Sequence, residues 1–263
     1  SKESVQTFGA AAGTSPYKVL NLLPSVNTES DDPFGLVQNQ NSLRIRGQLA
    51  DTGKSFSQTI NGLPILSPMG HGIMGNLVDT SNLHSLSLYK GPVPADAGFG
   101  FGNTSGALDL NIEAPAEQFG ASIEQKVGSF GFTRSFARLD SGALPTTGTR
   151  VFGSVSYARE DKWRGTGEIN NFNLMGGIAQ PLFEDRVKVE VYGIYNSFDQ
   201  DEFRGLTYNQ TKDMSNYRGF DYNSSLSGNP KVDWNYYDYN RQYFDEAAFF
   251  SNLEVKMWQG ATL

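Results

Sequence analysis

The feature that most constrains the fold of this chain is a series of alternating runs that begins near Phe119 and continues to its end. In each run apolar residues alternate with polar ones, which is typical of β-strands with one apolar face. The clearest runs are residues 121–127, 151–157, 171–178, 187–191 and 247–257. We expect each strand, counted with the residues that flank this alternating core, to reach roughly 9–11 residues or more, the length that a tilted strand needs to cross a bilayer, so the runs predict strands of a transmembrane β-barrel.

The connectors between these runs support a barrel. Short connectors alternate with longer ones, and residues 199–241 form one very long loop. Such a loop argues against a compact soluble domain, whereas barrels carry long loops on their outer side. We count about six strands, and known single-chain barrels start at about eight. We therefore expect this sequence to be the N-terminal part of a longer protein, with a soluble six-stranded sandwich as the alternative.

One run fits a membrane strand poorly. Between Phe132 and Leu139, two arginines share a face with two phenylalanines: Arg134 and Arg138 alternate with Phe132 and Phe136. A charged residue on a strand face that otherwise carries large apolar side chains weakens the prediction of a strand at this point.

Composition excludes several classes of function. The 263 residues contain no cysteine, which removes disulfides and thiolate chemistry, and the net charge of −7 argues against a nucleic-acid partner. There is no run of about 20 apolar residues, as a transmembrane helix would need. The two histidines, His71 and His84, lack metal-ligand spacing, and no nucleophile elbow occurs. We expect no catalytic residue, no metal site and no cofactor, and hence no enzyme.

The residues before the alternating runs predict a different architecture. Residues 1–117 mix short apolar stretches with turn signals, which indicates a small α+β domain, and residues 118–263 form the barrel part. A glycine-dense stretch at residues 98–106 precedes a strand-like run at 107–112. Glycine at this density allows backbone to pack closely on backbone.

The long loop carries the candidate binding residues. Eight of the twelve tyrosines fall between Tyr195 and Tyr243, and aromatic residues with a polar group suit binding surfaces. Near the strand ends, an aromatic girdle at the membrane interface is the alternative. Deep in the loop, binding or loop packing is expected for six residues: Tyr217, Tyr222, Trp234, Tyr236, Tyr237 and Tyr239.

Five segments in order resemble the plug motifs of TonB-dependent outer-membrane receptors. They are residues 15–26 (L-x-x-x-P-G-V), 43–47 (I-R-G), 61–65 (D-G-V-P), 86–92 (E-V-x-R-G-P) and 98–115 (Y-G-x-x-x-x-G-G-x-I-N-I). The chain departs from the motifs at several positions: Ser25 stands for Gly, Ser87 for Glu, Lys90 for Arg, Ser105 for Gly, and Glu113-Ala114 for Thr-Lys. The resemblance implies an α+β plug domain inside a 22-stranded barrel.

The resemblance also implies a function and its partners. We expect a receptor in the outer membrane of a Gram-negative bacterium, surrounded by lipid, that takes up a scarce, bulky nutrient. The energy would come from a TonB-type inner-membrane complex driven by the proton-motive force. The most common cargo in this family is a ferric siderophore. The alternatives are a non-iron cargo such as cobalamin, a glycan or a peptide, and a surface-binding or assembly protein without transport.

Residue roles follow from the resemblance by position. The plug loop at residues 66–72 is the best candidate for a ligand-binding apex, which makes Met69 and His71 candidate ligand contacts. In the family, the basic residues of the I-R-G and R-G-P motifs pair with barrel carboxylates. Arg46 and Lys90 occupy these positions, so we expect them to lock the plug to the barrel.

Overall fold

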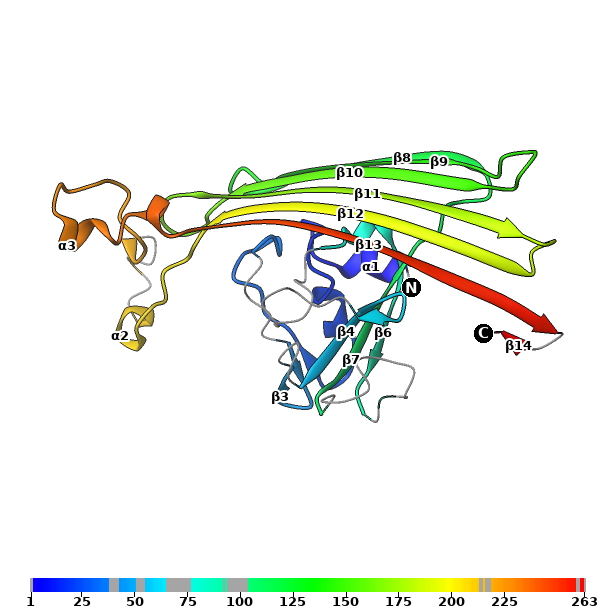
Figure 1. Ribbon diagram of the computed structural model, residues 1–263. Coiled ribbons are helices and arrows are strands. Elements are labelled where there is room, and N and C mark those ends of the chain that lie inside the picture. The colour runs from blue at the N-terminus through cyan, green and yellow to red at the C-terminus, as the bar shows by residue number, and fades with distance from the viewer. Residues whose placement is uncertain are drawn as a thin grey trace.

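A computed structural model describes residues 2–37, 43–50, 55–64, 77–91, 93, 104–212, 215, 219–258 and 261–262. The chain forms two layers (Figure 1): a long curved sheet, and a smaller mixed domain that packs against the concave face of this sheet. We call the smaller layer the N-terminal domain and the larger one the long sheet.

The long sheet is an antiparallel meander. Its seven strands follow the order β14-β13-β12-β11-β10-β9-β8, so each strand pairs with its neighbours in sequence. The strands are β8 (Phe119–Val127), β9 (Thr133–Ser141), β10 (Arg150–Asp161), β11 (Glu168–Leu182), β12 (Val187–Asp201), β13 (Arg241–Trp258) and β14 (Ala261–Thr262). The antiparallel strands expected from the alternating runs are thus confirmed, including the strand over residues 132–139 that fitted poorly.

The alternation in sequence becomes two faces of the long sheet. In β10, Phe152, Ser154 and Ser156 are buried on the concave face, whereas Val155 and Tyr157 are 41% and 46% exposed on the convex face. Successive strand residues point to opposite faces, so the convex face of the sheet gathers exposed apolar side chains and the concave face gathers the buried ones. An exposed apolar face suits contact with lipid.

The two ends of the long sheet differ in their connections. One end carries residues 162–167 and residues 202–240, which include α2 (Tyr208–Thr211), α3 (Pro230–Asp233) and the 3₁₀ turn η4 (Tyr237–Tyr239). We call this the loop end, which lies at the left of Figure 1. The other end, the turn end, carries the connections at residues 142–149 and 183–186.

The N-terminal domain contains a four-stranded sheet in the order β5-β4-β7-β6, in which β4 and β7 are parallel. Its helices and 3₁₀ turns are α1 (Lys2–Phe8), η1 (Lys18–Leu22) and η2 (Thr80–Asn82). Its strands are β1 (Val26–Asn27), β2 (Arg44–Ile45), β3 (Gln48–Leu49), β4 (Phe56–Ile60), β5 (Leu63–Pro64), β6 (Leu83–Tyr89) and β7 (Gly106–Ile112). No helix in the described residues has the length and apolar character to cross a membrane.

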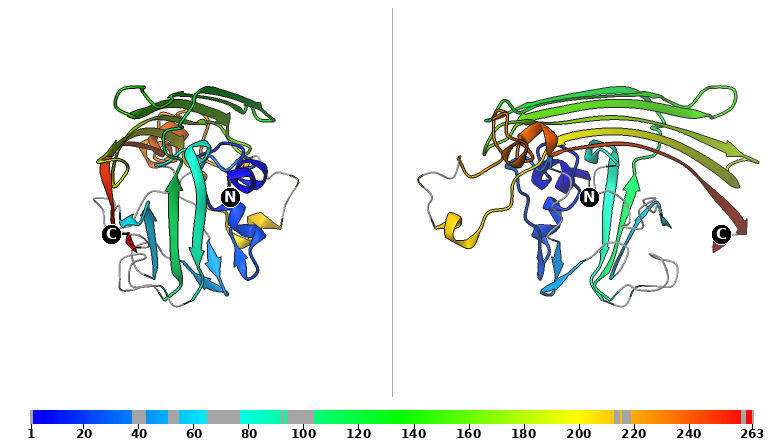
Figure 2. Two further views of the ribbon diagram at one scale, coloured as in Figure 1. Left: turned by 90° about the vertical axis from the view of Figure 1, so that its right-hand side faces the viewer. Right: turned by 60° about the vertical axis from the view of Figure 1, so that its left-hand side comes forward.

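The two layers share one hydrophobic core. Leu83 and Leu108 of the N-terminal domain belong to the same buried cluster as Phe152, Tyr192 and Phe250 of the long sheet. The end-on view in Figure 2 shows the sheet curving over the N-terminal domain. Apolar burial of this kind is the main attraction between two layers, at about 25 cal/mol per Å², so the N-terminal domain is held firmly in the concave face.

The fold predicts opposite outcomes for two glycines on β10 and β11. A Cβ on Gly177 would lie 2.5 Å from Phe152 Cε1 and 2.7 Å from Tyr192 Cδ1, whereas a Cβ on Gly153 meets nothing within 4 Å. Gly177→Ala should therefore destabilise the folded protein by about 1–3 kcal/mol, as overpacking of a core does. Gly153→Ala should be neutral or stabilising by about 0.5–1 kcal/mol. Thermal unfolding in detergent micelles measures both, and equal effects would contradict the packing described for Gly177.

Candidate functional site

A fully buried charge joins the two layers. Arg134 of β9 has no exposed side-chain surface. Its Nη2 donates to Asp79 Oδ1 of the N-terminal domain at 2.7 Å and to Ser81 Oγ at 2.8 Å, while Nη1 lies 3.1 Å from Glu124 Oε2 on β8. A buried guanidinium needs such partners, because an unpaired charge in the interior is very costly. Arg134 therefore fixes the position of Asp79 relative to the long sheet.

The N-terminal domain is shaped around this guanidinium. Gly13 has a φ of +72°, and a Cβ built on it would lie 2.5 Å from Nε of Arg134. Only glycine combines this left-handed backbone with such a close approach. Asp79 also accepts from Ser81 N at 2.8 Å, and Thr80 N donates to Gly13 O at 2.7 Å. We call Arg134, Asp79, Ser81 and Gly13 the latch.

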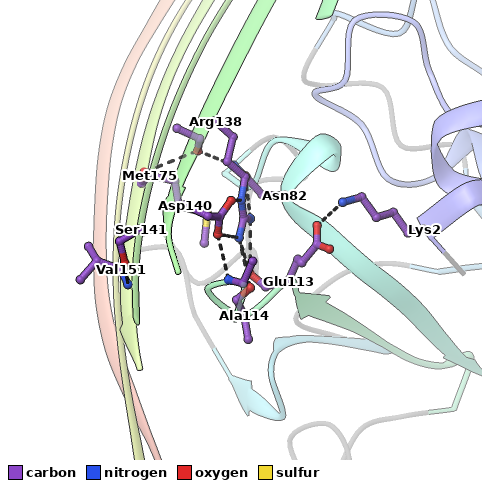
Figure 3. A network of polar contacts seen from close by, with 11 residues as sticks. Lys2, Asn82, Glu113, Ala114, Arg138, Asp140, Ser141, Val151 and Met175 are labelled. Carbon is purple, nitrogen blue, oxygen red and sulfur yellow. Dashed lines mark hydrogen bonds and ion pairs between the residues drawn. The ribbon is translucent and has the colours of Figure 1, made fainter. Parts of the chain in front are cut away.

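A second arginine extends the contact toward the turn end. Arg138 of β9 binds Asp140 of the same strand through two hydrogen bonds of 2.9 Å each. Its Nη2 also donates to two backbone carbonyls of the N-terminal domain, Glu113 O at 3.3 Å and Ala114 O at 3.1 Å (Figure 3). Its guanidinium carbon lies 3.9 Å from the ring centroid of Phe152. Arg138 thus holds the segment that leads from the N-terminal domain into β8.

Arg46 and Lys90, the residues expected to lock the plug, lie together elsewhere on the N-terminal domain. Arg46 is exposed and its backbone N–H donates to Ser25 O at 2.7 Å, while Lys90 Nζ donates to Pro24 O at 3.1 Å. Within the described residues neither forms an ion pair with a carboxylate of the long sheet. Their pairing with barrel carboxylates stays a prediction for strands other than β8–β14, and in this chain the charged contacts come from Arg134 and Arg138.

A pocket of about 650 Å³ opens at the loop end, between residues 162–166 and residues 219–227. We call it the loop pocket. Aromatic and neutral polar side chains line it, among them Trp163, Tyr222 and Ser225. Lys162 Nζ lies 3.0 Å from Asp221 Oδ2, and both side chains are buried. Burial lowers the pKa of the Lys162 ammonium, and the carboxylate of Asp221 opposes that shift.

The predicted binding residues fall into three groups. Tyr222 lines the loop pocket. Tyr236, Tyr237 and Tyr239 form an aromatic cluster beside it, with the ring centroid of Tyr236 at 4.9 Å from Tyr237 and 5.2 Å from Tyr239. Trp234 is 61% exposed and is not part of the pocket lining. Three further candidates lie outside the described residues: Met69, His71 and Tyr217.

Sequence reasoning missed the latch, although one signal for it was present. Arg134 and Arg138 occupy inward positions of a strand, and an inward charge on a barrel strand requires a partner inside the barrel. The same reasoning missed Trp163 and the pair of Lys162 with Asp221, for which the sequence carries no comparable signal. In the described residues, no group of three His, Cys, Asp or Glu side chains is arranged to hold a metal ion.

The latch predicts a specific effect of removing its charge. Arg134→Met leaves Asp79 and Glu124 without their cation, which should weaken docking of residues 77–83 by about 3–5 kcal/mol. Arg159→Met is the control, because Arg159 pairs with Glu168 at 2.9 Å on the exposed face, where an ion pair contributes about 0–1 kcal/mol. Hydrogen exchange of amides 77–83 reports the opening free energy, and equal values for the two variants would contradict a docking role for Arg134.

Comparisons with known proteins bear on both layers. Residues 3–107 match the family model described as the TonB-dependent Receptor Plug Domain. A comparison with curated protein sequences finds no match. The siderophore receptor PiuA from Acinetobacter baumannii superposes with a TM-score of 0.70 at 13% identity, over 100% of this chain and 34% of that chain.

Two further solved structures share the fold. The ferripyoverdine receptor of the Pseudomonas aeruginosa outer membrane has a TM-score of 0.62 at 16% identity, over 88% of this chain and 28% of that chain. The copper transporter OprC has a TM-score of 0.54 at 13% identity, over 72% of this chain and 28% of that chain. The chain thus spans about a third of the length of the structures that it matches.

These likenesses account for both layers of the molecule. The N-terminal domain is the plug, and the long sheet matches the N-terminal third of a receptor barrel. TonB-dependent receptors are transporters of the Gram-negative outer membrane rather than enzymes. Residues 3–107 are a TonB-dependent receptor plug domain, and the long sheet that follows has the fold of the first strands of a receptor barrel.

Proposed function

We propose that this chain belongs to a receptor that takes up a scarce, bulky nutrient across the outer membrane, with energy from a TonB-type inner-membrane complex. The observation that carries the proposal is the plug docked in the concave face of the barrel wall. A plug in this position blocks passage, so transport requires it to move. Movement has to break the contacts of Arg134 and uncover part of the shared core, and this requires an external source of work.

The cargo that we propose is a ferric siderophore. Of two proteins whose folds this chain shares, PiuA is described as a siderophore receptor, and the Pseudomonas aeruginosa protein as a ferripyoverdine receptor. In this chain the loop pocket and the adjacent tyrosines offer rigid aromatic contact area with polar groups. Met69, His71 and Tyr217 remain part of the proposed ligand surface, together with Tyr222, Trp234 and the cluster of Tyr236, Tyr237 and Tyr239.

A non-iron cargo is the second candidate, and the neutral polar groups of the loop pocket are compatible with it. The charges of Lys162 and Asp221 neutralise each other, and Asn223, Ser224 and Ser225 add neutral hydrogen-bonding groups. Neutral polar groups beside aromatic rings also suit a hydroxyl-rich ligand such as a glycan. The likeness to the copper transporter OprC shows that this fold serves different cargoes.

An uptake assay in cells that express the whole receptor tests the proposal. Under iron limitation, cells should accumulate ⁵⁵Fe presented as a ferric siderophore, and a protonophore should abolish the accumulation. A TonB-deficient strain should behave like protonophore-treated cells. Uptake that survives both treatments would refute energised transport. Energised uptake of a neutral oligosaccharide, but not of the ferric siderophore, would establish the second candidate.

A single aromatic substitution tests whether the loop pocket takes the cargo. Tyr222→Ala should weaken cargo binding by about tenfold or more, because aromatic contacts at binding sites commonly contribute more than about 1.4 kcal/mol. Tyr243→Ala is the matched control, since Tyr243 is 62% exposed on the outer face of β13 and is not part of the pocket lining. Calorimetric titration of the purified receptor measures both affinities, and an equal loss in the two variants would place the binding site elsewhere.

A further inference from the structure

Trp163 belongs to the loop pocket and to the plug interface at the same time. Its side chain is half-buried and lines the pocket. Its indole N–H donates to the backbone carbonyl of Asp31, in the plug, at 2.6 Å. A group that enters the pocket against the indole therefore acts on a residue that is bonded directly to the plug.

The plug segment that Trp163 contacts is internally stiff. The Asp32 carboxylate accepts hydrogen bonds from three backbone N–H groups, those of Phe34, Leu36 and Val37, at 2.8–3.0 Å. The ring of Phe34 stacks on Phe132 of the barrel wall, with centroids 4.1 Å apart. Because one carboxylate fixes several peptide groups, we expect residues 31–37 to move as a unit.

The same segment is hydrogen-bonded to both neighbours of Gly13 in the latch. Ala12 N donates to Phe34 O at 3.0 Å, and Thr14 Oγ1 donates to Gly35 O at 2.9 Å. Between these two attachments lies Gly13, whose α-carbon faces the guanidinium of Arg134. A displacement of residues 31–37 thus acts on both neighbours of the residue that seats the buried cation of the latch.

We propose that these contacts form a relay that couples occupancy of the loop pocket to the latch between plug and barrel. Trp163 is the positioning residue at the pocket end, and Gly13 is the positioning residue at the latch end. The relay rests on the proposed function, in which the loop pocket takes the cargo. When a ligand binds in the loop pocket, outside the plug, the relay weakens the contact between Arg134 and Asp79. The plug is therefore released only when cargo is present.

A contiguous set of contacts couples the loop pocket to the latch only if a change at the pocket alters the equilibrium between the closed and the open latch. This change can be measured without knowing the cargo. The chain has no cysteine, so Ser225→Cys places a unique thiol of residues 1–263 in the loop pocket. In the whole receptor, with any other cysteine replaced, fluorescein maleimide on this thiol serves as the probe that fills the pocket. Hydrogen exchange of amides 34–37 and 80–83 reports on the stiff segment and on the latch.

The expected result is a response that depends on the indole N–H. Labelling should raise exchange at amides 80–83 by about tenfold in the parent, which corresponds to about 1.4 kcal/mol, and by less than twofold in Trp163→Phe. Phenylalanine keeps an aromatic wall but cannot donate to Asp31 O. Tyr157→Phe is the matched control, because it also removes an aromatic donor, the hydroxyl that donates to Asn170 Oδ1 at 2.9 Å, but on the exposed face of the long sheet and outside the pocket lining, so it should leave the response intact.

Two further variants keep the outcome decisive. Leu226→Cys carries the same label at a residue that is 52% exposed and outside the pocket lining, and its label should leave amides 80–83 unchanged. Gly13→Ala places a methyl group against the guanidinium, so exchange at the latch should already be raised and should respond little to the label, while amides 34–37 still respond.

Two results would overturn the relay. One is exchange at amides 80–83 that does not change when the parent is labelled, and the other is an equal change in exchange in Trp163→Phe. Failure of the proposed function looks different, because the label replaces the cargo. A receptor with an intact, indole-dependent response but no energised uptake refutes the proposed transport alone. A receptor with energised uptake in which labelling leaves exchange at amides 80–83 unchanged refutes the relay alone.

Discussion

A guanidinium with no exposed surface has to be neutralised where it lies, and the rest of the structure depends on how Arg134 meets this requirement. The strand β9 places it on the concave face of the barrel wall, where the plug supplies Asp79 and the neighbouring strand supplies Glu124. A desolvated cation between two carboxylates fixes position more strictly than apolar contact does, because its hydrogen bonds have direction. The apolar core holds the plug in the wall, and Arg134 determines where in the wall it sits.

The polar contacts around Arg134 belong to an interface that has to open when the plug moves. Apolar burial is non-directional and tolerates small shifts, whereas a buried ion pair loses much of its stabilisation when one partner moves. An interface that combines both is strong at rest and has one place at which a small displacement matters most. Gly13 lies at that place, and hydrogen bonds of its neighbours Ala12 and Thr14 lead through residues 31–37 to Trp163 in the wall of the loop pocket.

The sequence predicted the architecture more completely than the contacts between its layers. Alternation along residues 151–157 is a local property, and it was sufficient to predict β10 and the faces of its side chains. The plug motifs likewise resemble the family segment by segment. The partner of Arg134, by contrast, is 55 residues away along the chain, and nothing near either residue specifies the pairing. The pairing of Lys162 with Asp221 has the same character, because only the folded loops bring the two together.

The central claim is that Arg134 and Asp79 act together in docking the plug, and a double-mutant cycle tests it most directly. The free energy that protects amides 80–83 from exchange is measured in the receptor, in Arg134→Met, in Asp79→Asn and in the double variant. If the two residues stabilise docking through each other, the double variant loses less than the sum of the single losses, by at least about 1 kcal/mol. Strictly additive losses would contradict this account and would leave the apolar core as the sole determinant of where the plug sits.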